Sequence, residues 1–167
     1  MDPRLQVKLF AAFVPIVVGA IWYNPYLFGK LWGSSVGLAA ERTSAARVAV
    51  IVIITYIAGF YIAGALGSIV IHQRGIYSML AGDPDMKDKG SALYNTVQGL
   101  MDKYGHNFRT FKHGALHGSF TGLYLVLPVL LVIGLLERKK LCWIFVHGAF
   151  WVMTLAVMGG IICEYMP

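Results

Sequence analysis

Charged residues are scarce in this sequence. Asp, Glu, Lys and Arg together make up 13% of the 167 residues, whereas 57% are hydrophobic. A soluble domain typically has about a quarter of its residues charged. The few charges lie between long uncharged runs, which is the pattern of a protein that crosses a membrane several times. The net charge of +6 therefore indicates basic residues at a membrane surface, and with no soluble basic module we expect no nucleic-acid binding.

Cysteine is also rare, and its spacing excludes a disulfide within one chain. Cys142 and Cys163 fall at opposite ends of one apolar segment, 21 positions apart. In a helix with a rise of about 1.5 Å per residue they would lie roughly 31 Å apart. Bridged cysteines need alpha carbons within about 7 Å. The two thiols therefore indicate no redox compartment.

The sequence lacks the usual signatures of catalysis. It has no glycine-framed serine and no phosphate-binding glycine loop, and Ser119 beside His117 has no acid in the same segment. The acidic stretch GDPDMKDKG has Lys87 where an EF-hand needs its third ligand, and the downstream glutamate is absent. We therefore expect neither an enzyme nor a calcium site.

Four long apolar segments are present instead, over residues 5–23, 45–71, 110–136 and 141–163. About 20 apolar residues suffice to span a bilayer as a helix. Thr43 or Ser44 can cap the second segment, and residues 91–104 have the spacing of an amphipathic helix. The sequence thus predicts a single all-α integral membrane domain over residues 1–167. Its four transmembrane helices form a compact bundle, and the amphipathic helix lies on the membrane surface or over the bundle between helices 2 and 3.

The stretch GAIWYNPYLFGKLW, residues 19–32, resembles the N-terminal signature of the domain-of-unknown-function 1761 (DUF1761) family of small bacterial membrane proteins. Asn24 stands where serine is common. The resemblance implies a four-helix protein of the bacterial cytoplasmic membrane, and it implies no established activity. The matching residues are Gly19, Trp22, Tyr23, Pro25, Phe28, Gly29 and Trp32.

Small residues recur every four positions in two of the apolar segments. Residues four apart share one face of a helix, and small side chains let the backbones of two helices approach closely. We therefore expect one small-residue face to pack against the other. The two sets are Gly59, Ala63 and Gly67, and Gly114, Gly118 and Gly122.

Histidines mark the third segment, where His113 and His117 lie one helical turn apart. Imidazoles inside a lipid-embedded helix are uncommon and usually face protein or water. Two of them at this spacing can chelate zinc, copper or iron. His147 enters the membrane from the opposite side and is excluded by its depth. The candidate metal ligands are His113, His117, His72 and Glu164, with His106 as an alternative.

Two other interpretations of these histidines stay open. In the first, His113 lies at the interface and His117 hydrogen-bonds a neighbouring helix, which contributes on the order of 1 kcal/mol. In the second, they belong to a pocket that handles protons or solutes. That pocket would be lined by His117, Thr121, Tyr56 and Tyr61.

Four spans place both termini and the long connection on one side of the membrane. Three basic residues at positions 138–140 predict that the last turn is cytoplasmic, so the termini would face outward. We expect a structural or accessory component of the bilayer, associating with itself or with a membrane partner. The alternative is a protein that binds a divalent metal, or transports a small solute with protons, at the histidines on the terminus side.

Overall fold

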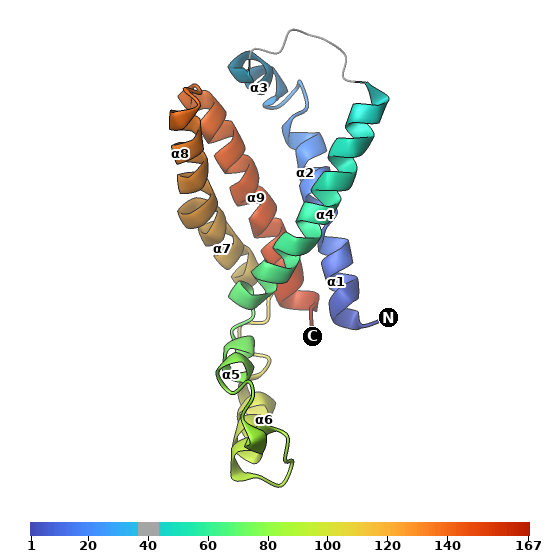
Figure 1. Cartoon of the computed structure of the whole chain (residues 1–167), viewed down its shortest axis with the longest axis vertical. Helices are drawn as coiled ribbons and strands as arrows, with labels where there is room; N and C mark the ends of the chain where they lie inside the picture. The colour runs from blue at the N-terminus through green and yellow to red at the C-terminus, as the bar shows by residue number, and fades with distance from the viewer. Residues whose placement is uncertain (37–43) are drawn as a thin grey trace.

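The computed structural model describes residues 1–36 and 44–167, and all regular structure in this part is helical. Four helical segments are long and apolar enough to cross a membrane (Figure 1). The predicted all-α class and the number of apolar helices are thereby confirmed. The four segments are Pro3–Trp22 (α1, Pro3–Ala11, and α2, Val14–Trp22), α4 (Ala45–Val70), Phe111–Leu136 (α7, Phe111–Thr121, η2, Gly122–Val126, and α8, Leu127–Leu136) and α9 (Leu141–Tyr165).

Proline accounts for the irregular points within two of these segments. Pro15 stands in the first turn of α2, where it has no N–H to donate. The chain between α1 and α2 instead makes the tighter bond from Phe13 N to Phe10 O, at 3.1 Å. Pro128 similarly follows η2, a π-helical turn in which the N–H of Leu127 donates to the carbonyl of Gly122. Both segments therefore continue across their breaks.

The long helices converge at the end where both termini lie and spread apart at the other end (Figure 1). The buried cluster belongs to the converging half and includes Ala63, Leu66, Met158 and Ile162. Residues 45–54 of α4, in contrast, are all exposed. Ser44 caps this helix by accepting from the N–H of Arg47, and Thr43 lies outside the described residues. The helices thus pack closely at one end, rather than along a bundle of uniform width.

The two small-residue faces do not pack on each other, so the expected pairing is wrong. A side chain added at Gly114 would overlap the backbone of Gly159, and one added at Gly118 would overlap the carbonyl of Leu155, so this face lies against α9. The other face contacts different partners. A Cβ at Gly59 would lie 2.7 Å from the carbonyl oxygen of Ala12, at the break between α1 and α2.

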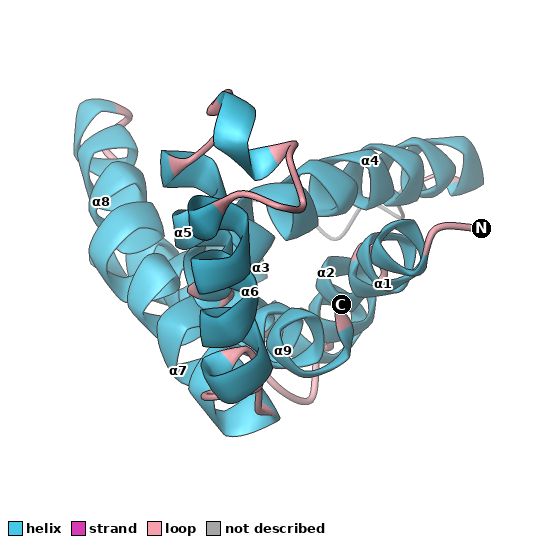
Figure 2. Cartoon of the chain, turned by 90° about the horizontal axis from the view of Figure 1, so that it is seen from below, coloured by secondary structure: helices cyan, strands magenta, loops and turns pink. Residues whose placement is uncertain are grey.

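Three of the remaining helices form an extension between α4 and α7. They are α5 (Gln73–Met79), the short 3₁₀ helix η1 (Pro84–Met86) and α6 (Ala92–Tyr104). Ser91 caps α6 by accepting from the N–H of Tyr94, and Val97 is buried. Figures 1 and 2 show α5 and α6 beyond the converging end of the long helices. The amphipathic helix therefore projects from that end and does not cover the long helices.

The tight turn after α2 leads into α3 (Gly29–Val36). The carbonyl of Asn24 accepts from the N–H groups of Leu27 and Gly29, and a Cβ at Gly29 would overlap the backbone of Tyr23. Trp22 stacks on Phe28 at 4.4 Å and donates from its indole to the carbonyl of Val146 on α9. Glycine at position 29 is thus required for the turn that fixes the end of α2.

Candidate metal centre

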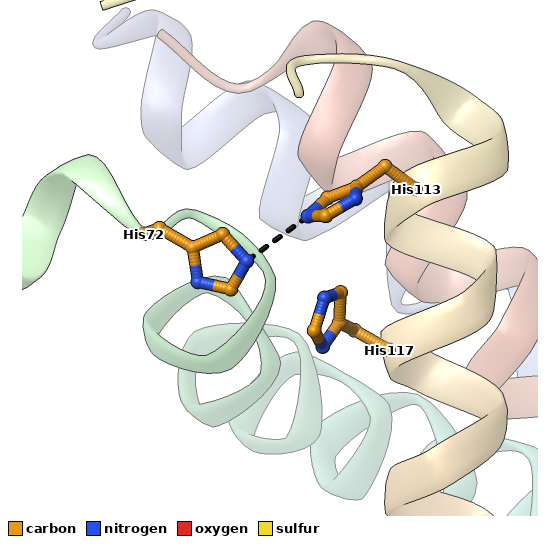
Figure 3. Close-up of side chains that lie close together, drawn as sticks. All are labelled: His72, His113 and His117. Carbon is orange, nitrogen blue, oxygen red and sulfur yellow. Dashed lines mark hydrogen bonds between the residues drawn. The ribbon is translucent and has the colours of Figure 1, made fainter. Parts of the chain in front are cut away.

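Three histidines meet where the end of α4 approaches the start of α7 (Figure 3). His72 follows Ile71, whose extended backbone ends α4, and it immediately precedes α5. His113 and His117 lie one turn apart on α7, and Thr110 caps this helix by accepting from the N–H of His113. The turn after α4 and the first two turns of α7 therefore supply the three imidazoles from separate parts of the chain.

One nitrogen from each ring lies within 4.8 Å of the corresponding nitrogens of the other two. The Nε2 atoms of His72 and His113 are 2.9 Å apart, and the centroids of the His113 and His117 rings are 4.5 Å apart. Three nitrogens bound to tetrahedral zinc at about 2.0 Å would be separated by about 3.3 Å. Small side-chain rotations would therefore convert the observed arrangement into a coordination geometry.

The surroundings of the three rings leave the site accessible. His72 is exposed, and His113 and His117 are half-buried. The neighbouring Lys112 is itself exposed, so its charge is screened by water. Three neutral nitrogen donors suit zinc, copper, nickel or iron better than calcium or magnesium. With three protein ligands, a fourth position would stay open for water or another small ligand.

The structure brings together only part of the predicted ligand set. His72, His113 and His117 converge, whereas Glu164 and His106 are exposed and lie outside this cluster. A carboxylate is therefore absent from the group as it stands.

The predicted solute pocket is not assembled. Tyr56 donates to the carbonyl of Leu9, which directs it toward α1. Tyr61 is 72% exposed, and the hydroxyl of Thr121 donates to the carbonyl of His117 within its own helix. These side chains do not surround a common cavity with the His117 ring.

A second polar pair, missed in the sequence, lies near the opposite end. The Tyr23 hydroxyl and Nδ1 of His147 are 2.7 Å apart, and the Trp143 ring stands 4.5 Å from the His147 ring. The depth of the two residues could have predicted this contact, because both lie near the same end of their spans.

Comparison with known protein families finds one family whose model covers almost the whole chain. A family model described as "Protein of unknown function (DUF1761)" matches residues 7–163. The chain belongs to the DUF1761 family. The resemblance seen in residues 19–32 is thereby confirmed, and the DUF1761 match also includes His72, His113 and His117. No curated protein and no solved structure matches this chain. Because the family description carries no activity, the geometry of the site is the basis for a function.

Proposed function

We propose that this DUF1761 protein is a multi-pass membrane protein that binds a divalent transition-metal ion through His72, His113 and His117. The observation that supports the proposal is the convergence of three imidazole nitrogens, within 4.8 Å of one another, from the turn after α4 and from α7. Four apolar helices indicate the membrane setting. A bound ion would link the end of α4 to the start of α7, so it would also strengthen the packing of the converging half.

A structural role for the histidines is the main competing explanation. In it, the hydrogen bond between His72 and His113 joins the two helices, and such a bond contributes on the order of 1 kcal/mol. That bond leaves the position of His117 unexplained, because its ring has no hydrogen-bond partner among residues 1–36 and 44–167. Coordination of an ion accounts for all three side chains.

The test is a titration of the purified full chain with zinc, after chelator treatment and in detergent. We expect one ion per chain. Changing His113 to alanine should weaken the affinity at least tenfold, since the loss of even a residue that supports a ligand costs roughly 10–100-fold. His106→Ala is the matched control, because this exposed histidine lies shortly before α7 but outside the cluster.

Acidification provides a second readout for the same site. An imidazole must be neutral to ligate a metal, so protons and zinc compete for the three nitrogens. Zinc affinity should fall as the pH decreases from about 7.5 to about 5. Binding that is absent, or that survives His113→Ala unchanged, would overturn the proposal.

We further propose that the protein resides in the bacterial inner membrane with both termini outside. The support is the turn between α8 and α9, where residues 138–140 are all basic, because short basic loops stay in the cytoplasm. The expected partner is the lipid itself, against the exposed apolar residues of α4. Labelling of Lys139→Cys and Ser91→Cys variants, each also carrying Cys142→Ser and Cys163→Ser, with a membrane-impermeant maleimide in intact cells tests this orientation. Only the cysteine at position 91 should react, and labelling at position 139 alone would reverse the assignment.

A further inference from the structure

Three arginines line one pocket at the converging end of the molecule. Arg4 comes from the start of α1, Arg74 from α5 and Arg109 from the loop before α7. The cavity has a volume of about 480 Å³ and is completed by Ile71, Gln73, Tyr77 and Pro167. Figure 2 views the molecule from this end and shows the start of α1, the C-terminus and α5. This volume lies within the range of about 300–1,000 Å³ that is usual for small-ligand sites.

Arg109 has a structural role in this pocket. Its Nε donates to the carbonyl of Cys163 at 2.8 Å, and its Nη2 donates to the carbonyl of Met166. These carbonyls stand at the end of α9, where a helix favours a positive charge. Arg109 therefore caps α9 and at the same time presents its charge to the cavity.

Helix capping does not account for Arg4 and Arg74. The half-buried guanidinium of Arg74 lies over Gly67. Among the described residues its one hydrogen bond is that from Nη2 to the thioether sulfur of Met166, a weak acceptor at 2.9 Å. The Arg4 side chain has no hydrogen bond in the described part of the chain. Most of the donors on these two residues are therefore free.

Carboxylates do not balance the three charges. Within residues 1–36 and 44–167 the one ion pair joins Lys139 to Glu137, at the opposite end of the molecule. Burial and the neighbouring charges of Arg4 and Arg109 lower the pKa of Arg74. Like charges held together in a partly desolvated pocket repel one another, and an anion in the cavity would remove this cost.

We propose that the pocket of Arg4, Arg74 and Arg109 binds a phosphate-bearing anion. Guanidinium groups suit phosphate because their forked donors match its oxygens, and donors from three directions suit a tetrahedral group. The pocket lies where the four apolar helices end, which is the level of lipid headgroups in a bilayer. The phosphate can therefore come from an anionic phospholipid or from a small soluble phosphate.

The experiment uses the full chain in detergent, with a chelator present so that the histidine site is free of metal. Three probes are titrated separately: dioctanoyl phosphatidylglycerol, dioctanoyl phosphatidylcholine and inorganic phosphate. We expect the anionic lipid to bind at least about tenfold more tightly than the zwitterionic one, since the choline ammonium would be repelled by the arginines. Binding of inorganic phosphate would identify a soluble ligand. Tight binding of the anionic lipid without binding of inorganic phosphate would identify a lipid headgroup.

Variants that each remove one positive charge test which residues bind the anion. Arg4→Gln should weaken binding about tenfold, and the Arg4 side chain makes no hydrogen bond within the described residues whose loss would affect folding. Arg74→Gln should act similarly, as should raised salt concentration. Lys8→Gln, which removes a charge from the same helix outside the pocket, should change affinity less than twofold.

The proposal fails if none of the probes binds, or if both lipids bind equally and Arg4→Gln has no effect. Because the chelator removes metal, this result is independent of the metal-binding proposal. His113→Ala should leave the anion affinity unchanged, so failure of one proposal can be distinguished from failure of the other.

Discussion

One hydrogen bond between Tyr23 and His147 joins the end of α2 to α9. The Tyr23 hydroxyl and Nδ1 of His147 form a hydrogen bond of 2.7 Å, and the tautomer of the ring sets which of the two donates. In either tautomer, Nε2 of His147 is buried without a partner in the described residues. An unsatisfied buried group is costly, and the surrounding rings, including Phe150 at 5.2 Å from the Tyr23 ring, must offset it. The pair therefore depends strongly on its single bond.

Removing the Tyr23 hydroxyl should accordingly destabilise the protein. Tyr23→Phe would leave both ring nitrogens of His147 unpaired at a cost of about 1–2 kcal/mol, measured as unfolding free energy in detergent. Tyr26→Phe is the control, because Tyr26 is 96% exposed three residues away. Equal stability of the two variants would show that the bond does not contribute.

At the scale of elements, the close approach of α7 to α9 holds the histidines in place. Gly114 and Gly118 lie directly on the α9 backbone, and His113 and His117 adjoin them on the same helix. Any separation of α7 from α9 would also move these two rings away from His72, which is attached to α4. The glycine contacts thus set the geometry of the candidate metal site.

A methyl group at Gly118 should disturb both packing and metal affinity. Gly118→Ala would force the helices apart at a cost of about 1–3 kcal/mol and should weaken zinc binding, measured by the same titration. Gly64→Ala serves as the control, because a Cβ there meets nothing within 4 Å. A Gly118→Ala protein with the stability and zinc affinity of the control would refute this coupling.

The elements also show what the sequence can and cannot predict. Hydrophobic length located the four apolar helices, since each needs about 20 residues to span a bilayer. The spacing of Gly114 and Gly118 predicted a close contact but not its partner, because a small face fits any helix that reaches it. The short turn between α8 and α9 would have indicated α9 as the partner, because helices joined by a short turn pack side by side. The expected side of the membrane suggested His72 as a neighbour of His113, but it could not show that Glu164 lies outside the cluster.

For the whole molecule, stability resides in the converging half. Leu66 is 2% exposed in the core between α4 and α9, whereas Ile53, on the same helix, is 58% exposed. Two apolar grooves border α4. One is lined by Ile51 and Phe150 in the half where the helices spread apart, and the other lies beside Ile62 and Ile69, nearer the converging end. In a bilayer, acyl chains would fill these spaces.

Truncation to alanine should lower the stability far more in the converging half of α4 than in its open half. Leu66→Ala leaves a cavity and should cost about 2 kcal/mol or more, measured by thermal unfolding in detergent. Ile53→Ala shortens a side chain that is mostly exposed and should cost less than about 0.5 kcal/mol. A large loss at Ile53 would mean that the open end of α4 is packed in the native protein.

The π-helical turn η2 has a consequence for insertions and deletions. It holds one residue more than a regular α-helical turn would, and each residue advances a helix by about 100°. With that extra residue, Gly122 faces Val152 and Gly134 faces Ile144 on α9. Loss of a single residue from 122–126 would restore an uninterrupted α-helix and rotate α8 by roughly a quarter turn. Gly134 would then point away from α9, while His113 and His117 kept their places.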